Sequence, residues 1–161
     1  MNHDLILSLE LLEQEAWGFR FRMTAENRSR VKLLLPSPEI IGIRFGNVET
    51  MKEAEWFTGL LVSAARGEFA LQTSESRSFE WRVRPCDVER PESTDDFNYF
   101  RWCTEIPIGN YLVWYQWRVD ENYFAPDSHM KLPNLESVAK REGAVVWMGQ
   151  ALSNRIRVSR S

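Results

Sequence analysis

The sequence is poor in the residue types that most often carry catalysis or bind metals. Two histidines and two cysteines occur in 161 residues; they lack the local spacing of a zinc site, and two cysteines do not make a disulfide framework. A phosphate-binding glycine loop, a dinucleotide-binding fingerprint and a nucleophile-elbow motif are all missing. We therefore predict a protein that is not an enzyme and that needs no cofactor and no metal.

The sequence also lacks an excess of positive charge and a long apolar run. Its net charge is −3 and its pI about 5.5, whereas domains that bind nucleic acids are usually basic. We interpret Arg155, Arg157 and Arg160 as the solvated face of a strand and predict no nucleic-acid partner. No segment approaches the roughly 20 apolar residues of a membrane helix, and no basic segment opens a secretion signal. These absences predict a cytoplasmic protein without a membrane partner.

The sequence leaves open whether the two cysteines, Cys86 and Cys103, bond to each other. Cys103 lies between Trp102 and Thr104 in an expected strand, and we interpret it as a buried apolar side chain. A bond between Cys86 and Cys103 would require an oxidising compartment. Asn27 begins an Asn-Arg-Ser glycosylation sequence, which we interpret as a turn because no secretion signal is evident.

Aromatic residues in alternating segments are what the sequence does contain. It has seven Trp, nine Phe and four Tyr, and residues 17–23, WGFRFRM, alternate large apolar side chains with arginine. Residues 78–83, SFEWRV, repeat that alternation, which is typical of strands with one buried and one solvated face. About eight to ten such strands predict an all-β, antiparallel sandwich, with residues 1–161 as a single domain.

Helix is expected only in short pieces between the strands. Residues 85–98 and 120–143 are long insertions with loop composition. Within the second insertion, the segment LESVAKRE after Asn134 predicts a short helix that stops at Gly143. Residues 49–57, ETMKEAEWF, fit either a short helix or an extended edge segment.

Residues 106–111, IPIGNY, resemble the tyrosine corner of immunoglobulin-like and fibronectin-like sandwiches. Ile108, Gly109 and Tyr111 would carry this feature, in which the tyrosine hydroxyl bonds to backbone a few residues upstream. The segment GQALSNRIRV at the end of the chain resembles the last strand of bacterial immunoglobulin-like domains. The resemblance implies an immunoglobulin-like β-sandwich with Trp81 as its core tryptophan.

A second resemblance is to the bacterial intracellular proteinase inhibitor family, which is also a small β-sandwich. Residues 23–37, MTAENRSRVKLLLPS, are similar to its early strand-turn-strand pattern, and SFEWRVRP and IPIGNY are similar to its later strands. The resemblance implies the same architecture. Inhibition does not follow from it, because a fold does not fix a function and no inhibitory motif is present.

The aromatic strand at residues 111–119 carries the candidate binding site. Alternation places one set of side chains in the core: Tyr111, Val113, Tyr115, Trp117 and Val119. Leu112, Trp114, Gln116 and Arg118 face the other way. Either the chain's own loop or short helix covers Trp114, or Trp114 forms a partner-binding patch. The other patch residues would be Tyr123, Phe124, Met130 and Leu132.

These observations predict a non-enzymatic protein-interaction module, an intracellular inhibitor or adaptor that binds through loops and an exposed aromatic patch. The partner would be another protein or a second copy of the chain. The alternative is a carbohydrate-binding β-sandwich module, because flat aromatic side chains stack on sugar rings. That alternative requires exposed, coplanar Trp or Tyr side chains on one face.

Overall fold

The computed structural model of the protein describes residues 4–59, 67–120 and 135–161. Strands dominate these residues, in several sheets whose pairs are antiparallel with one short parallel exception. The all-β class expected from the alternating segments is therefore confirmed. No helix in the described ranges is long and apolar enough to cross a membrane.

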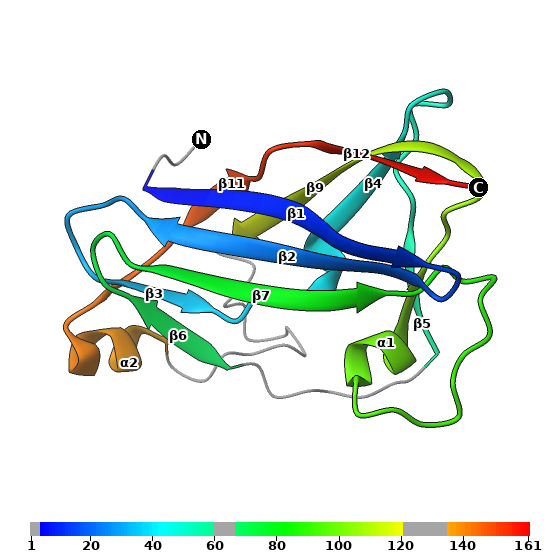
Figure 1. Cartoon of the computed structure of the whole chain (residues 1–161). Helices are drawn as coiled ribbons and strands as arrows, with labels where there is room; N and C mark the ends of the chain where they lie inside the picture. The colour runs from blue at the N-terminus through cyan, green and yellow to red at the C-terminus, as the bar shows by residue number, and fades with distance from the viewer. Residues whose placement is uncertain (1–3, 60–66, 121–134) are drawn as a thin grey trace.

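The first sheet contains three antiparallel strands in the order β1-β2-β7 (Figure 1). Their bounds are β1 (Leu5–Glu15), β2 (Gly18–Asn27) and β7 (Ser76–Val83). As the alternation predicts, Phe19, Phe21 and Met23 are buried, whereas Arg20 and Arg22 lie on the outer face. Trp17 precedes β2 and is only half-buried.

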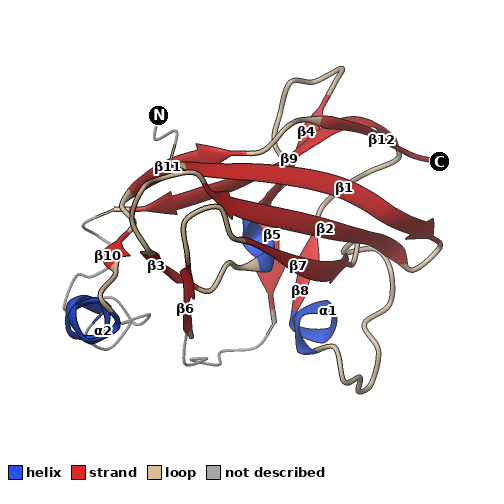
Figure 2. Ribbon diagram, turned by 60° about the vertical axis from the view of Figure 1, so that its left-hand side comes forward, coloured by secondary structure: helices blue, strands red, loops and turns tan. Residues whose placement is uncertain are grey.

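The second sheet is built around the aromatic strand, β9. Its strands are β4 (Ile43–Asn47), β9 (Gly109–Val119), β11 (Gly149–Leu152) and β12 (Ile156–Arg160). Strand β4 pairs with one edge of β9, and β11 and β12 pair one after the other with its opposite edge (Figure 2). All four strands therefore depend on β9 for their backbone pairing.

The two sheets bury their aromatic faces against each other. The rings of Trp81 on β7 and Tyr115 on β9 stack with centroids 5.4 Å apart and planes 5° apart. Phe45 on β4 contacts Phe19 and Phe21 on β2, each at 5.8 Å. All five residues expected on the inner side of β9 are buried in this core. The prediction that these five side chains of β9 face the core is therefore confirmed.

The predicted hydrogen bond at the corner before β9 is present. The hydroxyl of Tyr111 donates to the carbonyl oxygen of Pro107 at 2.5 Å. The bond closes the short loop that leads into β9, as the segment IPIGNY indicates. Trp81 is 7% exposed and contributes to the core, as the resemblance implies.

A third, smaller sheet supports the longer helix. It contains β3 (Leu33–Pro36), β6 (Glu68–Leu71) and the short parallel strand β10 (Val145–Val146). The helix α2 (Leu135–Glu142) buries Leu135 and Ala139 against Leu34 of this sheet. Gly143 follows with a φ of 66°, the left-handed stop that the sequence predicts. The predicted short helix is thus confirmed.

A two-stranded ribbon closes the other end of the molecule. It consists of β5 (Trp56–Thr58) and β8 (Trp102–Thr104), with the helix α1 (Phe97–Arg101) preceding β8. The helix corrects the expectation of loop and strand here. Asp96 caps it, because its carboxylate accepts a hydrogen bond from the backbone N–H of Tyr99 at 3.0 Å.

The ambiguous segment at residues 49–57 adopts its extended alternative. Glu53 forms a bridge with Gly46, and the N–H of Ala54 donates to the carbonyl of Phe45 at 2.8 Å. These bonds lay the segment along the outer edge of β4. A 3-10 turn, η1 (Ile40–Gly42), leads into β4 from the other side.

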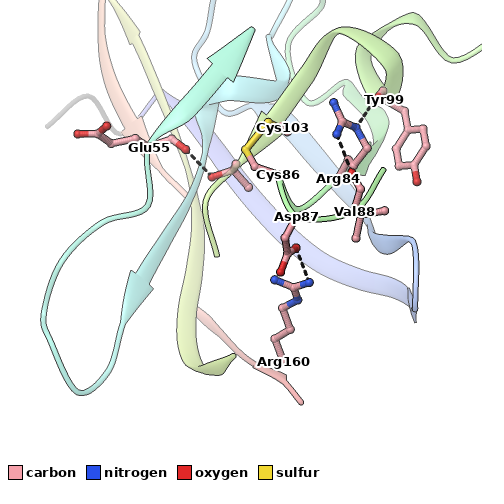
Figure 3. Close-up of a disulfide and its surroundings, with 9 residues drawn as sticks. Glu55, Arg84, Cys86, Asp87, Val88, Tyr99, Cys103 and Arg160 are labelled. Atoms are coloured by element: carbon pink, nitrogen blue, oxygen red, sulfur yellow. Dashed lines mark hydrogen bonds and ion pairs between the residues drawn. A yellow bond between two sulfur atoms is a disulfide. The ribbon is translucent and has the colours of Figure 1, made fainter. Parts of the chain in front are cut away.

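Cys86 and Cys103 form a disulfide, with their Cα atoms 4.9 Å apart (Figure 3). The interpretation of Cys103 as an apolar filler is therefore wrong. Two backbone bonds run beside the disulfide: Cys86 donates to Thr104, and Thr104 donates to Arg84, each at 3.0 Å. The chain beyond β7 is thereby joined to β8 both covalently and by hydrogen bonds.

Asn27 occupies a buried turn, as predicted from the sequence. Its side-chain nitrogen donates to the carbonyls of Val31 at 2.8 Å and Leu71 at 2.9 Å. Its side-chain oxygen accepts from the N–H of Ser29 at 2.9 Å. With 0% of its surface exposed, this amide has no room for a glycan in the folded protein.

Candidate functional site

The outer face of the second sheet carries arginines grouped around one tryptophan. Strand pairing places Arg44 of β4 beside Trp114 of β9, and Arg157 of β12 beside Leu112. Arg155, just before β12, lies over the Trp114 ring, with its guanidinium carbon 4.9 Å from the ring centroid. We call the surface formed by these five residues the arginine face.

The three arginines of this face have no carboxylate partner among the described residues. Strands β4, β9, β11 and β12 contain no Asp or Glu at all. Glu53 borders the sheet through its bridge to Gly46, but it forms no ion pair with Arg44, Arg155 or Arg157 in the part of the chain that is described. Positive charge therefore accumulates on this face, although the whole chain is acidic.

On the outer face of the first sheet, Arg20 and Arg22 form ion pairs with carboxylates. Arg22 of β2 contacts Glu10 of β1 at 2.8 Å and Glu80 of β7 at 2.9 Å, so it lies between two carboxylates. Those hydrogen bonds raise the pKa of Arg22 above its usual value. Arg20 pairs with Glu13 at 3.5 Å. Arg82 of β7, opposite Arg20, instead lies over the rings of Trp17 and Tyr99. The arginine face differs from the first sheet in having three arginines and no ion pair to any of them among the described residues.

Trp114 is 8% exposed and does not form the exposed anchor that the sequence analysis considers. Arg155 covers its ring, and the edge of the ring lies close to Gly46, where an added Cβ would sit 3.1 Å from it. The helix α2 packs on Leu34 of the third sheet.

The other predicted patch residues lie outside the described residues, and their role stays a prediction. They are Tyr123, Phe124, Met130 and Leu132.

The guanidinium groups of this face are placed to donate hydrogen bonds. A guanidinium stacked on an aromatic ring keeps its N–H edge free, and that edge matches a carboxylate or phosphate in a two-bond geometry. Arg155 has this arrangement over Trp114. An anionic ligand on the face would therefore find donors that are not already used.

A second polar cluster surrounds the disulfide, but its groups bond to the chain itself (Figure 3). Arg84 is buried and donates to the carbonyls of Tyr99 at 3.1 Å and Val88 at 2.9 Å. Burial lowers the pKa of Arg84 because it removes water from the cation. Asp87 binds Arg160 at 2.6 Å, and this hydrogen bond lowers the pKa of Asp87. The cluster fixes the start of the 85–98 insertion.

Groups of three or more His, Cys, Asp or Glu side chains arranged to hold a metal ion do not occur among the described residues. No protein-family model, no curated protein and no solved structure matches this chain.

The arginine face was not predicted from the sequence, because its residues come from three separate segments of the chain. The absence of acidic residues from residues 43–47, 109–119 and 149–160 is the signal that could have revealed it.

Proposed function

We propose that the protein is a non-enzymatic interaction module that binds a partner protein through the arginine face. The observation that carries the proposal is the group of three arginines without carboxylate partners on one sheet face. Arg22 on the first sheet lies between two carboxylates, whereas Arg44, Arg155 and Arg157 on the second have none in the described structure. Arginine is also among the residues that contribute most to protein interfaces.

The proposed binding site lies on a sheet face and not on the aromatic patch expected from the sequence. Trp114 contributes as the platform that orients Arg155, and not as an exposed anchor. The immunoglobulin-like relationship belongs to the same proposal: the hydrogen bond from Tyr111 to Pro107 and the buried Trp81 support it.

The carbohydrate-binding alternative has no observation in its favour. It requires exposed, coplanar Trp or Tyr side chains, and all seven tryptophans lie within the described ranges. None of the seven is exposed: Trp81, Trp114, Trp117 and Trp147 are buried and the other three are half-buried. The tryptophans therefore offer no exposed stacking platform for sugar rings.

The disulfide bears on where the protein works. Disulfides persist in oxidising compartments and are rare in the cytosol, so the bond between Cys86 and Cys103 supports an oxidising compartment over the cytoplasmic one expected from the sequence. The intracellular-inhibitor version of the function loses support for the same reason. Counting free thiols in protein isolated from its native cells under denaturation tests this: bridged cysteines leave none.

Site-specific photo-crosslinking in the native cell tests the interaction. A benzoylphenylalanine residue at Gln116, on the same side of β9 as Trp114, should yield a covalent adduct with a partner protein. The same residue at Ser78, on the outer face of the first sheet, is the matched control. An adduct specific to position 116 supports the proposed function. No adduct at 116, or equal adducts at both positions, would refute it.

A further inference from the structure

We infer that the arginine face recognises an extended, acidic segment of its partner, with carboxylates at alternate positions. This inference rests on the proposed function and adds the chemistry of the partner. It begins from the charge of the face, because Arg44, Arg155 and Arg157 offer three cations and the four strands of the sheet offer no acid. Complementary charge is what selects one partner surface over another.

The spacing of the arginines favours an extended segment. Arg155 and Arg157 are two residues apart and both lie on the outer side, since one covers Trp114 and the other pairs with Leu112. Alternate residues of an extended chain are about 7 Å apart, and alternate side chains point the same way. Two carboxylates at positions i and i+2 of an extended partner therefore match Arg155 and Arg157.

The third arginine extends the match across the sheet. Arg44 and Arg155 lie on opposite sides of Trp114, on the two strand edges of β9. Neighbouring strands are about 4.8 Å apart, so the two arginines stand about 10 Å apart across the sheet. Because of this separation, a single acidic strand that pairs with Arg155 does not also pair with Arg44. A further carboxylate, from a neighbouring part of the partner, would pair with Arg44.

A protein fits this face better than a nucleic acid does. Proteins that bind single strands stack bases on exposed aromatic rings, and Trp114 is 8% exposed beneath Arg155. The net charge of −3 also opposes the approach of a long polyanion. A short acidic segment experiences mainly the local charge of the face, because salt screens the remaining charges over about 8 Å.

Fluorescence anisotropy with a labelled (Glu-Thr)5 peptide tests the inference, because threonine favours extended chain and glutamate supplies the alternating carboxylates. We expect Arg155→Ser and Arg157→Ser each to weaken binding of this peptide about tenfold. Arg77→Ser is the matched control: Arg77 also stacks on an aromatic ring, 5.0 Å from the centroid of Phe69, and its loss changes the net charge equally. Binding by the Arg77→Ser protein should stay within about twofold of wild type.

Three results would overturn the inference. The first is that Arg77→Ser weakens peptide binding as much as Arg155→Ser and Arg157→Ser do. The second is that a (Gln-Thr)5 peptide binds as tightly as (Glu-Thr)5. The third is that a ten-nucleotide oligothymidylate binds more tightly than (Glu-Thr)5 and does so through Arg155 and Arg157. Thermal unfolding of each variant shows whether it is folded, and Arg157 is exposed, so its replacement leaves the core intact. Crosslinking at Gln116 with no binding of (Glu-Thr)5 would leave the proposed function standing and remove the acidic partner. Absence of crosslinking would remove the function itself.

Discussion

The side-chain amide of Asn154 bonds to both backbone groups of Leu9. Its oxygen accepts from the N–H of Leu9 at 2.8 Å, and its nitrogen donates to the carbonyl of Leu9 at 3.1 Å. Asn154 lies in the break between β11 and β12, whereas Leu9 lies in the middle of β1. One amide side chain thus takes the place of a strand partner and joins the edge of the first sheet to the second.

Replacing Asn154 with Ala should destabilise the protein by about 1–3 kcal/mol, because the N–H and C=O of Leu9 would lose their partners at a partly buried position. Asn154→Asp should also destabilise, since a carboxylate cannot donate to the carbonyl of Leu9. Urea unfolding measures both changes. Asn110→Ala is the control, because within the described residues the side chain of Asn110 makes a single bond, an exposed one with Ser159. Equal losses at positions 110 and 154 would contradict the bridging role.

Replacing Tyr111 with Phe should cost about 1–2 kcal/mol of unfolding free energy. The substitution keeps the buried ring and removes only the hydroxyl that donates to the carbonyl of Pro107. Chemical unfolding followed by tryptophan fluorescence gives the value. An unfolding midpoint that does not move would show that the corner bond contributes nothing to stability.

Removing the disulfide by the double substitution of Cys86 and Cys103 with Ser should destabilise the protein by about 3 kcal/mol. The bond closes a loop with a sequence separation of 17, and the chain-entropy model assigns roughly that value to a loop of this length. Calorimetry of the variant and of the wild type measures the difference. Reducing agent should lower the melting temperature of the wild type but not that of the variant. Equal effects on the two proteins would show that the disulfide is not formed.

The ion pair between Asp87 and Arg160 predicts a specific dependence of stability on pH. Because the hydrogen bond from Arg160 lowers the pKa of Asp87 in the folded state, its contribution is present above the unfolded pKa, about 3.9. That contribution is lost as pH falls through the lower folded pKa. The Asp87 side chain is 67% exposed, so solvent screening limits the pair to at most about 1 kcal/mol.

Urea midpoints of the wild type and of Asp87→Asn check this dependence. The difference between the two proteins should be constant between about pH 5 and pH 7 and should shrink below about pH 4. A difference that grows on acidification would reverse the sign and contradict the assignment. Because only one carboxylate changes, the remaining acid sensitivity of the two proteins cancels in the comparison.

Local features of the fold were predictable, because they depend on neighbours in sequence. The alternation around Phe19, Phe21 and Met23 determines which side of β2 is buried, and the helix stop at Gly143 needs only a left-handed residue. The helix α1 carried a usable signal in Asp96, a good capping residue. That signal was weak because the helix has only five residues.

Long-range features were not predictable in the same way. Whether Cys86 and Cys103 bond depends on the parallel bridge between Pro85 and Thr104, which their spacing does not reveal. The arginine face combines Arg44 with Arg155, and only the pairing of β4 and β12 with the same strand brings the two together. Alternation along one strand reports which side a residue faces and not which residues share that side.

The contacts between the first strand and the last two also set an order of events during synthesis. Asn154 reaches Leu9, and the side-chain nitrogen of Gln14 donates to the carbonyl of Ser159 at 2.6 Å, across sequence separations of 145 residues in both cases. These contacts cannot form until residues 154–159 have been synthesised and have left the ribosome. The hairpin of β1 and β2 can form earlier, and the bonds of Leu9 and Gln14 to the last two strands stay unmade during that interval. During that interval an unpaired strand edge is available to a chaperone or to another nascent chain.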